Sequence, residues 1–265
     1  MPKFTGLRFF LDSTKVIFLD LEYYVPPSDR ARKTPTGMLF SPFRPGHLVL
    51  GGTFMTYFPI QDRFLPPVSI WSWKEGSEKA ALAKIFALLQ KEWHIVESKE
   101  GLGSLMLCGI GISHSDVPTL ISKLVINVVA DPVRITDVMC GFRQIDLTTA
   151  TYCQFAFNNS YFAYPKTKSQ LYQKYLDGKK MESGKSVWEL YEAKNFRAIE
   201  DRCIEEVTDA LAIYRAMFTL KKKTDSALDK LKGFQKNHPE LFGAPRALPE
   251  AVKHSKDADD TSARS

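Results

Sequence analysis

Apolar residues occur in runs separated by proline- and glycine-containing stretches, and the early runs predict strands. The first, Lys15–Tyr24, ends in two carboxylates and two aromatic rings. Residues 47–58 and 68–73 are rich in β-branched and aromatic side chains, a composition that favours strands. Because these three runs follow one another without an intervening helical pattern, we expect an antiparallel meander.

Helical spacing of apolar residues begins after Ser77, which stands where an N-cap is expected. Residues 78–93 carry apolar positions three and four apart. Residues 105–112 form a continuous apolar run, which is typical of a buried parallel strand. The further elements that we predict are helices at 119–128, 169–176, 187–191, 196–220 and 225–234, and a strand at 141–147. The aromatic stretch 155–164 has no pattern that predicts its structure.

This order of strands and helices predicts one mixed α/β domain over residues 1–237. From residue 238 onward Pro, Ala, Ser, Asp and Lys dominate and aromatic residues almost vanish. Such a composition cannot bury enough apolar surface to offset the entropy of folding. We therefore expect residues 238–265 to be a disordered tail.

Net charge and cysteine spacing exclude only a few classes of function. The formal net charge of +6 is compatible with a polyanionic partner without requiring one, and the basic clusters at 30–33 and 221–223 are typical of solvated faces. No apolar run approaches the ~18 residues of a membrane span, and the N-terminus lacks a signal-peptide pattern, so we expect a cytoplasmic protein. No disulfide framework or zinc site is indicated by the spacing of Cys108, Cys140, Cys153 and Cys203.

Two acids near the end of the first predicted strand are the first candidate site. Side chains alternate between the faces of a strand, so Asp20 and Glu22 share one face. Two such carboxylates repel each other and are costly to desolvate unless a positive group lies between them. Mg²⁺ prefers carboxylate and water oxygens and is the simplest candidate. The alternative is an ordinary strand end whose acids reach solvent.

Two more acids follow further along the chain. Asp116 comes just after a predicted buried strand, where ligands of open α/β sheets bind, or else it caps the next helix. Glu206 lies within or beside the apolar stripe of the long helix. An acid in that position needs a partner. Either Arg202 in an i,i+4 pair or a metal ion would meet the need.

Three segments resemble the exonuclease motifs of the DEDD superfamily: Phe18-Leu-Asp-Leu-Glu22, the stretch 109–120 with its Asp116-Val-Pro-Thr-Leu120, and residues 199–214. The nearest branch is the stand-alone predicted 3′–5′ exonucleases related to the proofreading domain of family-B DNA polymerases. The resemblance extends from about residue 15 to residue 218. It implies a ribonuclease H-like fold, with a five-stranded mixed sheet flanked by helices.

The resemblance also implies a two-metal site. Its four metal-binding and catalytic acids fall on Asp20, Glu22, Asp116 and Glu206, which would hold two Mg²⁺ or Mn²⁺ ions. The chain departs from the family at two positions. Glu206 stands where an aspartate is usual, and Arg202 stands where a tyrosine normally orients the attacking water.

Four residues are candidates for contact with nucleic acid. Tyr23 or Tyr24 could stack on a base, or both could pack on the sheet. His114 could assist a proton transfer, although an exposed loop histidine without a role is the simpler interpretation. Arg202 cannot act as a base because it stays protonated, so it either contacts phosphate or pairs with Glu206.

Together these features predict a metal-dependent 3′–5′ exonuclease that acts on single-stranded DNA or RNA ends. The alternative is a catalytically weak or inactive relative that keeps the fold as a nucleic-acid-binding or interaction scaffold. A third interpretation is a protein-interaction domain that uses the aromatic region 152–164.

Overall fold

The computed structural model describes residues 14–34, 38–97, 105–151, 166–180 and 184–237. The chain divides into two compact units, Met1–Phe218 and Thr219–Ser265. Every strand among the described residues lies in the first unit. The aromatic region 152–164 and the expected tail, 238–265, lie outside the described residues.

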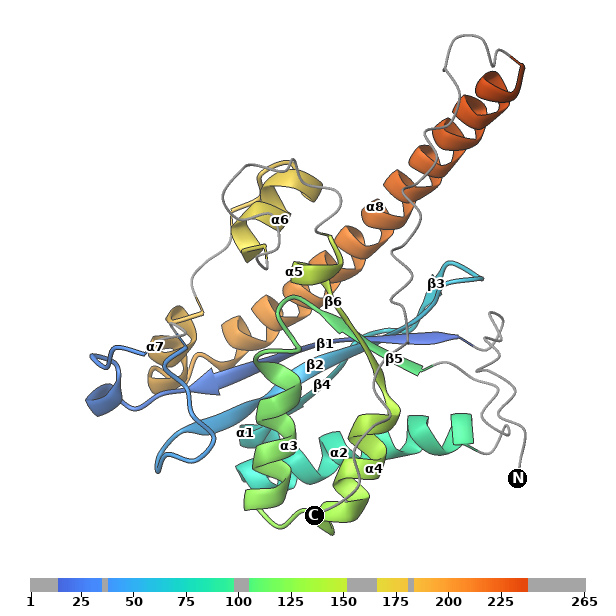
Figure 1. Cartoon of the computed structure of the whole chain (residues 1–265). Coiled ribbons are helices and arrows are strands. Elements are labelled where there is room, and N and C mark those ends of the chain that lie inside the picture. Colours follow the sequence, from blue (N-terminus) through green and yellow to red (C-terminus); the bar gives the residue numbers. More distant parts are fainter. Residues whose placement is uncertain (1–13, 35–37, 98–104, 152–165, 181–183, 238–265) are drawn as a thin grey trace, which may run out of the picture. The chain divides into compact units, whose positions relative to one another are not determined.

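The first unit contains a mixed six-stranded sheet (Figure 1). Strand β1 is at its centre, between β2 on one side and β5 on the other, and the order is β3-β2-β1-β5-β6 with β4 also paired to β2. The β1–β2, β2–β3 and β2–β4 pairs are antiparallel, and β1–β5 and β5–β6 are parallel. The strands are β1 Lys15–Tyr24, β2 Leu48–Phe58, β3 Arg63–Phe64, β4 Val68–Trp71, β5 Leu105–Gly109 and β6 Arg143–Asp146.

The expected antiparallel meander and the later parallel strand are confirmed, but the expected number of five strands is wrong by one. The additional strand, β3, follows a turn in which Asp62 adopts φ 45°. Pro66 and Pro67 separate it from β4, since proline has no N–H to continue the ladder. A two-residue strand carries too short a pattern to be predicted.

The helices follow the predictions at most positions. The short helix α4 was not predicted, although Asp131 caps it with its side chain and Pro132 begins it. The two helices expected at 196–220 and 225–234 are one, because no glycine or proline separates them. The helices are α1 Ser72–Glu75, α2 Glu78–Glu97, α3 Asp116–Ile126, α4 Pro132–Gly141, α5 Leu147–Ala150, α6 Lys168–Tyr175, α7 Ser186–Glu192 and α8 Phe196–Asn237. None of the described helices is both long enough and apolar enough to cross a membrane.

The alternation of side chains along β1 divides the core into two layers. Ile17, Leu19 and Leu21 pack in the layer that includes residues of α2, α3 and α4. Val16 and Phe18 belong to the other layer, which includes the α8 residues 207–217. Asp20 and Glu22 continue the Val16–Phe18 face by the same alternation. The fold therefore places both acids of β1 on the face of the sheet where the α8 residues 207–217 pack.

Candidate metal centre

The acids of β1 stand where its parallel pairing has ended. The β1–β5 ladder stops at the Phe18–Cys108 pair, while the β1–β2 ladder continues to Tyr24. Beyond Phe18 one edge of β1 is therefore open to side chains from the loop after β5. Asp116 uses this opening, because its Oδ1 accepts a hydrogen bond of 2.9 Å from the backbone N–H of Leu21.

Asp116 is not the N-cap of α3. That position belongs to Ser115, whose hydroxyl donates to Asp116 Oδ2, and Asp116 is the first residue of the helix. The interpretation of Asp116 as a simple helix cap is therefore wrong. Its buried carboxylate instead connects α3 to β1.

The loop that carries Asp116 is fixed by a residue that sequence reasoning did not select as a site residue. Asp146, at the end of β6, accepts hydrogen bonds from the backbone N–H groups of Gly111 (2.9 Å) and Ser113 (3.0 Å). It also accepts from the Ser113 hydroxyl, and from the N–H and hydroxyl of Thr148. Burial raises the pKa of Asp146, but the hydrogen bonds from Ser113 and Thr148 outweigh it and lower the pKa. The signal for it in the sequence was its position near the end of the strand predicted at 141–147.

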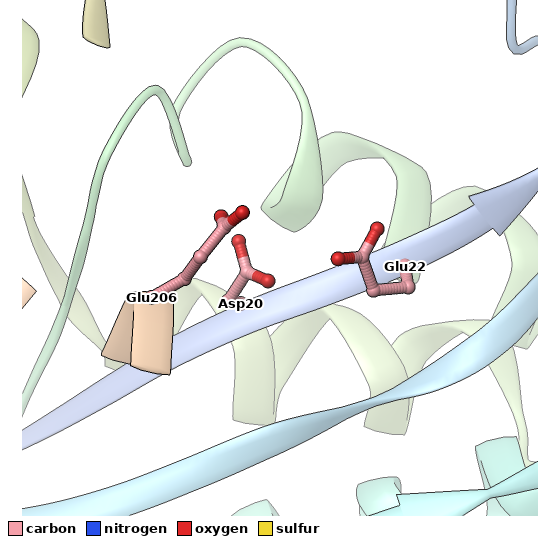
Figure 2. Close-up of side chains that lie close together, drawn as sticks. All are labelled: Asp20, Glu22 and Glu206. Atoms are coloured by element: carbon pink, nitrogen blue, oxygen red, sulfur yellow. The ribbon is translucent and has the colours of Figure 1, made fainter. Parts of the chain in front are cut away.

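Glu206 on α8 completes a cluster with the two acids of β1. One carboxylate oxygen each from Asp20, Glu22 and Glu206 lies within 4.8 Å of the others. Figure 2 shows the three carboxylates, two from β1 and one from α8, gathered on the same side of the strand. Glu22 and Glu206 are 6% and 5% exposed, so the alternative of a solvated strand end is wrong for Glu22. Asp116 is outside this group of three but lines the same cavity.

Two cations hold Glu206. Arg202 donates to its Oε1 from Nε at 3.1 Å and from Nη2 at 2.5 Å, which confirms the expected i,i+4 pair. Lys168, at the start of α6, donates to its Oε2. Arg202 Nε also lies 3.7 Å from Glu22 Oε1. The sequence did not point to Lys168, because it lies 38 residues from Glu206 and in a lysine-rich segment.

The four carboxylates differ in how easily they ionise. Burial, reinforced by the charges of Glu206 and Glu22, raises the pKa of Asp20 well above its usual value. Burial likewise raises the pKa of Glu22 to about 8 and that of Asp116 to about 6. For Glu206 the charges of Lys168 and Arg202 outweigh burial and lower the pKa. For Asp20 and Glu22 burial outweighs the same neighbouring cations, which lie closer to Glu206.

All four acids line one cavity of about 770 Å³, together with Lys168 and Arg202. A smaller cavity of about 200 Å³ adjoins it, since Glu22 and Tyr23 line both. Its other walls are largely apolar and aromatic: Met38, Leu39, Phe40 and Trp188, with Gly184 and Lys185.

The other candidate residues are spread around the cluster. Tyr23 lies against the Phe40 ring, with 4.5 Å between the ring centroids, and its buried hydroxyl makes no hydrogen bond with the described residues. Tyr24 packs on Tyr191 and donates to Glu192, as expected for a packing role. His114 is exposed, bonds to the Ser113 hydroxyl and does not line the cavity with the acids.

Comparison of the sequence with protein-family models and with curated proteins finds no match. The assignment of a function therefore depends on the geometry of the site and on the motifs of the sequence.

Proposed function

We propose that this protein is a metal-dependent 3′–5′ exonuclease with a ribonuclease H-like fold, and that it acts on single-stranded DNA or RNA. The observation that carries this proposal is the group of three carboxylates from β1 and α8 within 4.8 Å of one another. Two of these acids, Asp20 and Glu22, lie on the central strand of a mixed sheet flanked by helices, and this arrangement supports a ribonuclease H-like fold.

The residues present fit a hard divalent ion. Glu22 Oε1 is buried and lacks a hydrogen bond, and burial raises the pKa of Asp20 and Glu22, so a cation between them would stabilise their charged forms. Carboxylate oxygens are the ligands that Mg²⁺ and Mn²⁺ prefer. Asp20, Glu22 and Glu206 would hold such an ion, and Asp116 offers a fourth carboxylate in the same cavity. When bound, divalent ions lower the pKa of a water and stabilise charge on a phosphoryl group.

The rest of the cavity supports a nucleic-acid substrate. The adjoining cavity of about 200 Å³ is lined by Tyr23, Phe40 and Trp188 as well as by Glu22. Aromatic surfaces of this kind bind nucleobases without strong sequence preference. A base there would leave the attached phosphate close to the acids of β1.

A catalytically inactive scaffold is the second candidate. The observation that favours it is Arg202, which replaces the family's tyrosine and binds Glu206 in the cavity. An arginine cannot orient a water by accepting its proton. Such a protein would bind nucleic acid and leave it intact.

Digestion of 5′-labelled single-stranded DNA and RNA separates the two candidates. The wild-type protein is compared with Asp20→Asn in Mn²⁺, Mg²⁺ and EDTA, with a 3′-phosphate-blocked strand as a control for polarity. We expect stepwise shortening that requires metal, a free 3′ end and Asp20. Binding of both strands in a gel shift without any shortening would support the scaffold instead.

A further inference from the structure

We propose that Phe43 is a stacking platform for a nucleobase of the substrate strand, beside the smaller cavity of about 200 Å³ that Phe40 lines. This inference rests on the proposed function and adds a contact that neither of the two adjoining cavities provides. The platform holds a base within about three nucleotides of the one in the smaller cavity. Its ligand is a single strand of DNA or RNA.

Phe43 is 75% exposed, the largest exposed fraction among the large apolar side chains of the described residues. A single exposed apolar residue needs no explanation by itself, because such residues are common on protein surfaces. The loop that carries Phe43 supplies the argument, since successive turns and a buried anchor fix it in one conformation.

Two successive turns fix the backbone on either side of Phe43. One turn spans Ser41–Arg44 and the next spans Arg44–His47, each closed by a hydrogen bond from its last N–H to its first carbonyl. A proline stands second in each turn, where its fixed φ is already correct. A glycine stands third in the second turn and adopts φ 77°, a value that other residues rarely take. The sequence therefore specifies this loop closely.

A buried histidine ties the two ends of the loop together. The Ser41 N–H donates to His47 Nδ1 at 3.0 Å, so Nε2 carries the ring's proton and donates it to Asp29 Oδ2 at 2.7 Å. Arg44 donates to the same oxygen of Asp29 at 2.8 Å. A loop held in this way has little conformational freedom left to lose, and such preorganisation favours binding. The ring of Phe43 is thus presented to solvent on a fixed support.

The loop begins at a wall of the smaller cavity. Phe40 lines that cavity and packs on Tyr23, which lines it too. Three residues of chain span at most about 11 Å, so the Phe43 backbone lies within that distance of the Phe40 backbone. Stacked nucleotides are about 3.4 Å apart along a strand, so the same distance covers about three of them. Phe43 therefore lies within reach of a strand whose end occupies the smaller cavity.

The charges beside Phe43 favour a polyanion as the ligand. Asp29, which holds the loop, pairs with Arg44 at 2.8 Å and lies 3.6 Å from Arg32. Two positive charges around one negative charge leave an excess of positive charge near the exposed ring. Such an excess attracts phosphates from a distance, and the ring adds a stacking contact that any base accepts.

An abasic scan in EDTA tests the contact without any assay of activity. Wild type and Phe43→Ala are titrated with a fluorescent oligothymidylate, intact or lacking one base among its four 3′-terminal nucleotides. We expect Phe43→Ala to bind the intact strand about tenfold more weakly, because one base–aromatic stack is lost. This difference should vanish when the missing base is at one of the last three positions. A loss of the same size with every strand, or no loss, would overturn the inference.

Phe64→Ala is the matched control. It removes the same kind of ring, which is 50% exposed, from β3, and β3 pairs with the end of β2 that lies furthest from the loop. We expect this variant to bind the intact strand within about twofold of wild type, and a loss equal to that of Phe43→Ala would overturn the inference. Metal-dependent digestion with binding unchanged in Phe43→Ala would overturn the platform alone. A wild type that neither binds nor digests the strands would refute the proposed function itself.

Discussion

At the scale of single residues, the sequence identified the acids better than their partners. Asp20, Glu22 and Glu206 come together as the motifs predicted, and the pair between Arg202 and Glu206 follows from helical spacing alone. Lys168 could not be foreseen, because its contact with Glu206 joins two helices through tertiary packing. Local periodicity carries no information about which distant cation will fill a cavity.

Ionisation of Glu22 makes metal binding dependent on pH. Its pKa is raised to about 8 by burial, so the side chain is mostly protonated near pH 6, and an ion must displace that proton. Mn²⁺ affinity should therefore increase by more than about tenfold from about pH 6 to about pH 8. Calorimetric titration with Mn²⁺ at the two pH values measures this change in affinity. Glu22→Gln should bind more weakly and show a smaller pH dependence, and a flat wild-type profile would contradict the assignment.

At the scale of elements, β6 and the loop after β5 form one structural unit around Asp146. Asp146→Ala would leave the buried N–H groups of Gly111 and Ser113 without an acceptor and should reduce the free energy of unfolding by about 2–4 kcal/mol. Urea denaturation measures this change. Asp131→Ala removes the exposed side-chain cap of α4 and is the matched control, with an expected cost of about 1 kcal/mol. Equal costs in the two variants would mean that Asp146 does not hold the loop.

The elements themselves were largely predictable from the sequence, and their boundaries were less so. Long runs such as Lys15–Tyr24 and the helix from Glu78 have strong periodicity, and the structure confirms both. β3 has two residues, so pairing rather than pattern defines it, whereas α4 has a side-chain cap and buried residues at helical spacing and was missed. The sequence placed Asp116 after a buried strand, either as a ligand-binding residue or as a helix cap. Its hydrogen bond to Leu21 could not be predicted, because it depends on where the β1–β5 ladder stops.

At the scale of the whole molecule, the site belongs to the first of the two units. All four acids, Lys168 and Arg202 lie before Phe218, where this unit ends. A chain truncated after residue 218 should therefore keep the Mn²⁺ affinity of the full chain within about threefold. A larger loss, in a truncated protein whose circular dichroism shows it to be folded, would mean that later residues contribute to the site. The boundary falls inside the continuous helix α8, and no glycine or proline marks it in the sequence.

The most direct measurement is the anomalous difference map of a crystal grown with Mn²⁺. The account predicts a peak with carboxylate oxygens of Asp20 and Glu22 at about 2.2 Å. A map in which Mn²⁺ binds elsewhere, or not at all, would contradict the metal centre and with it the proposed nuclease.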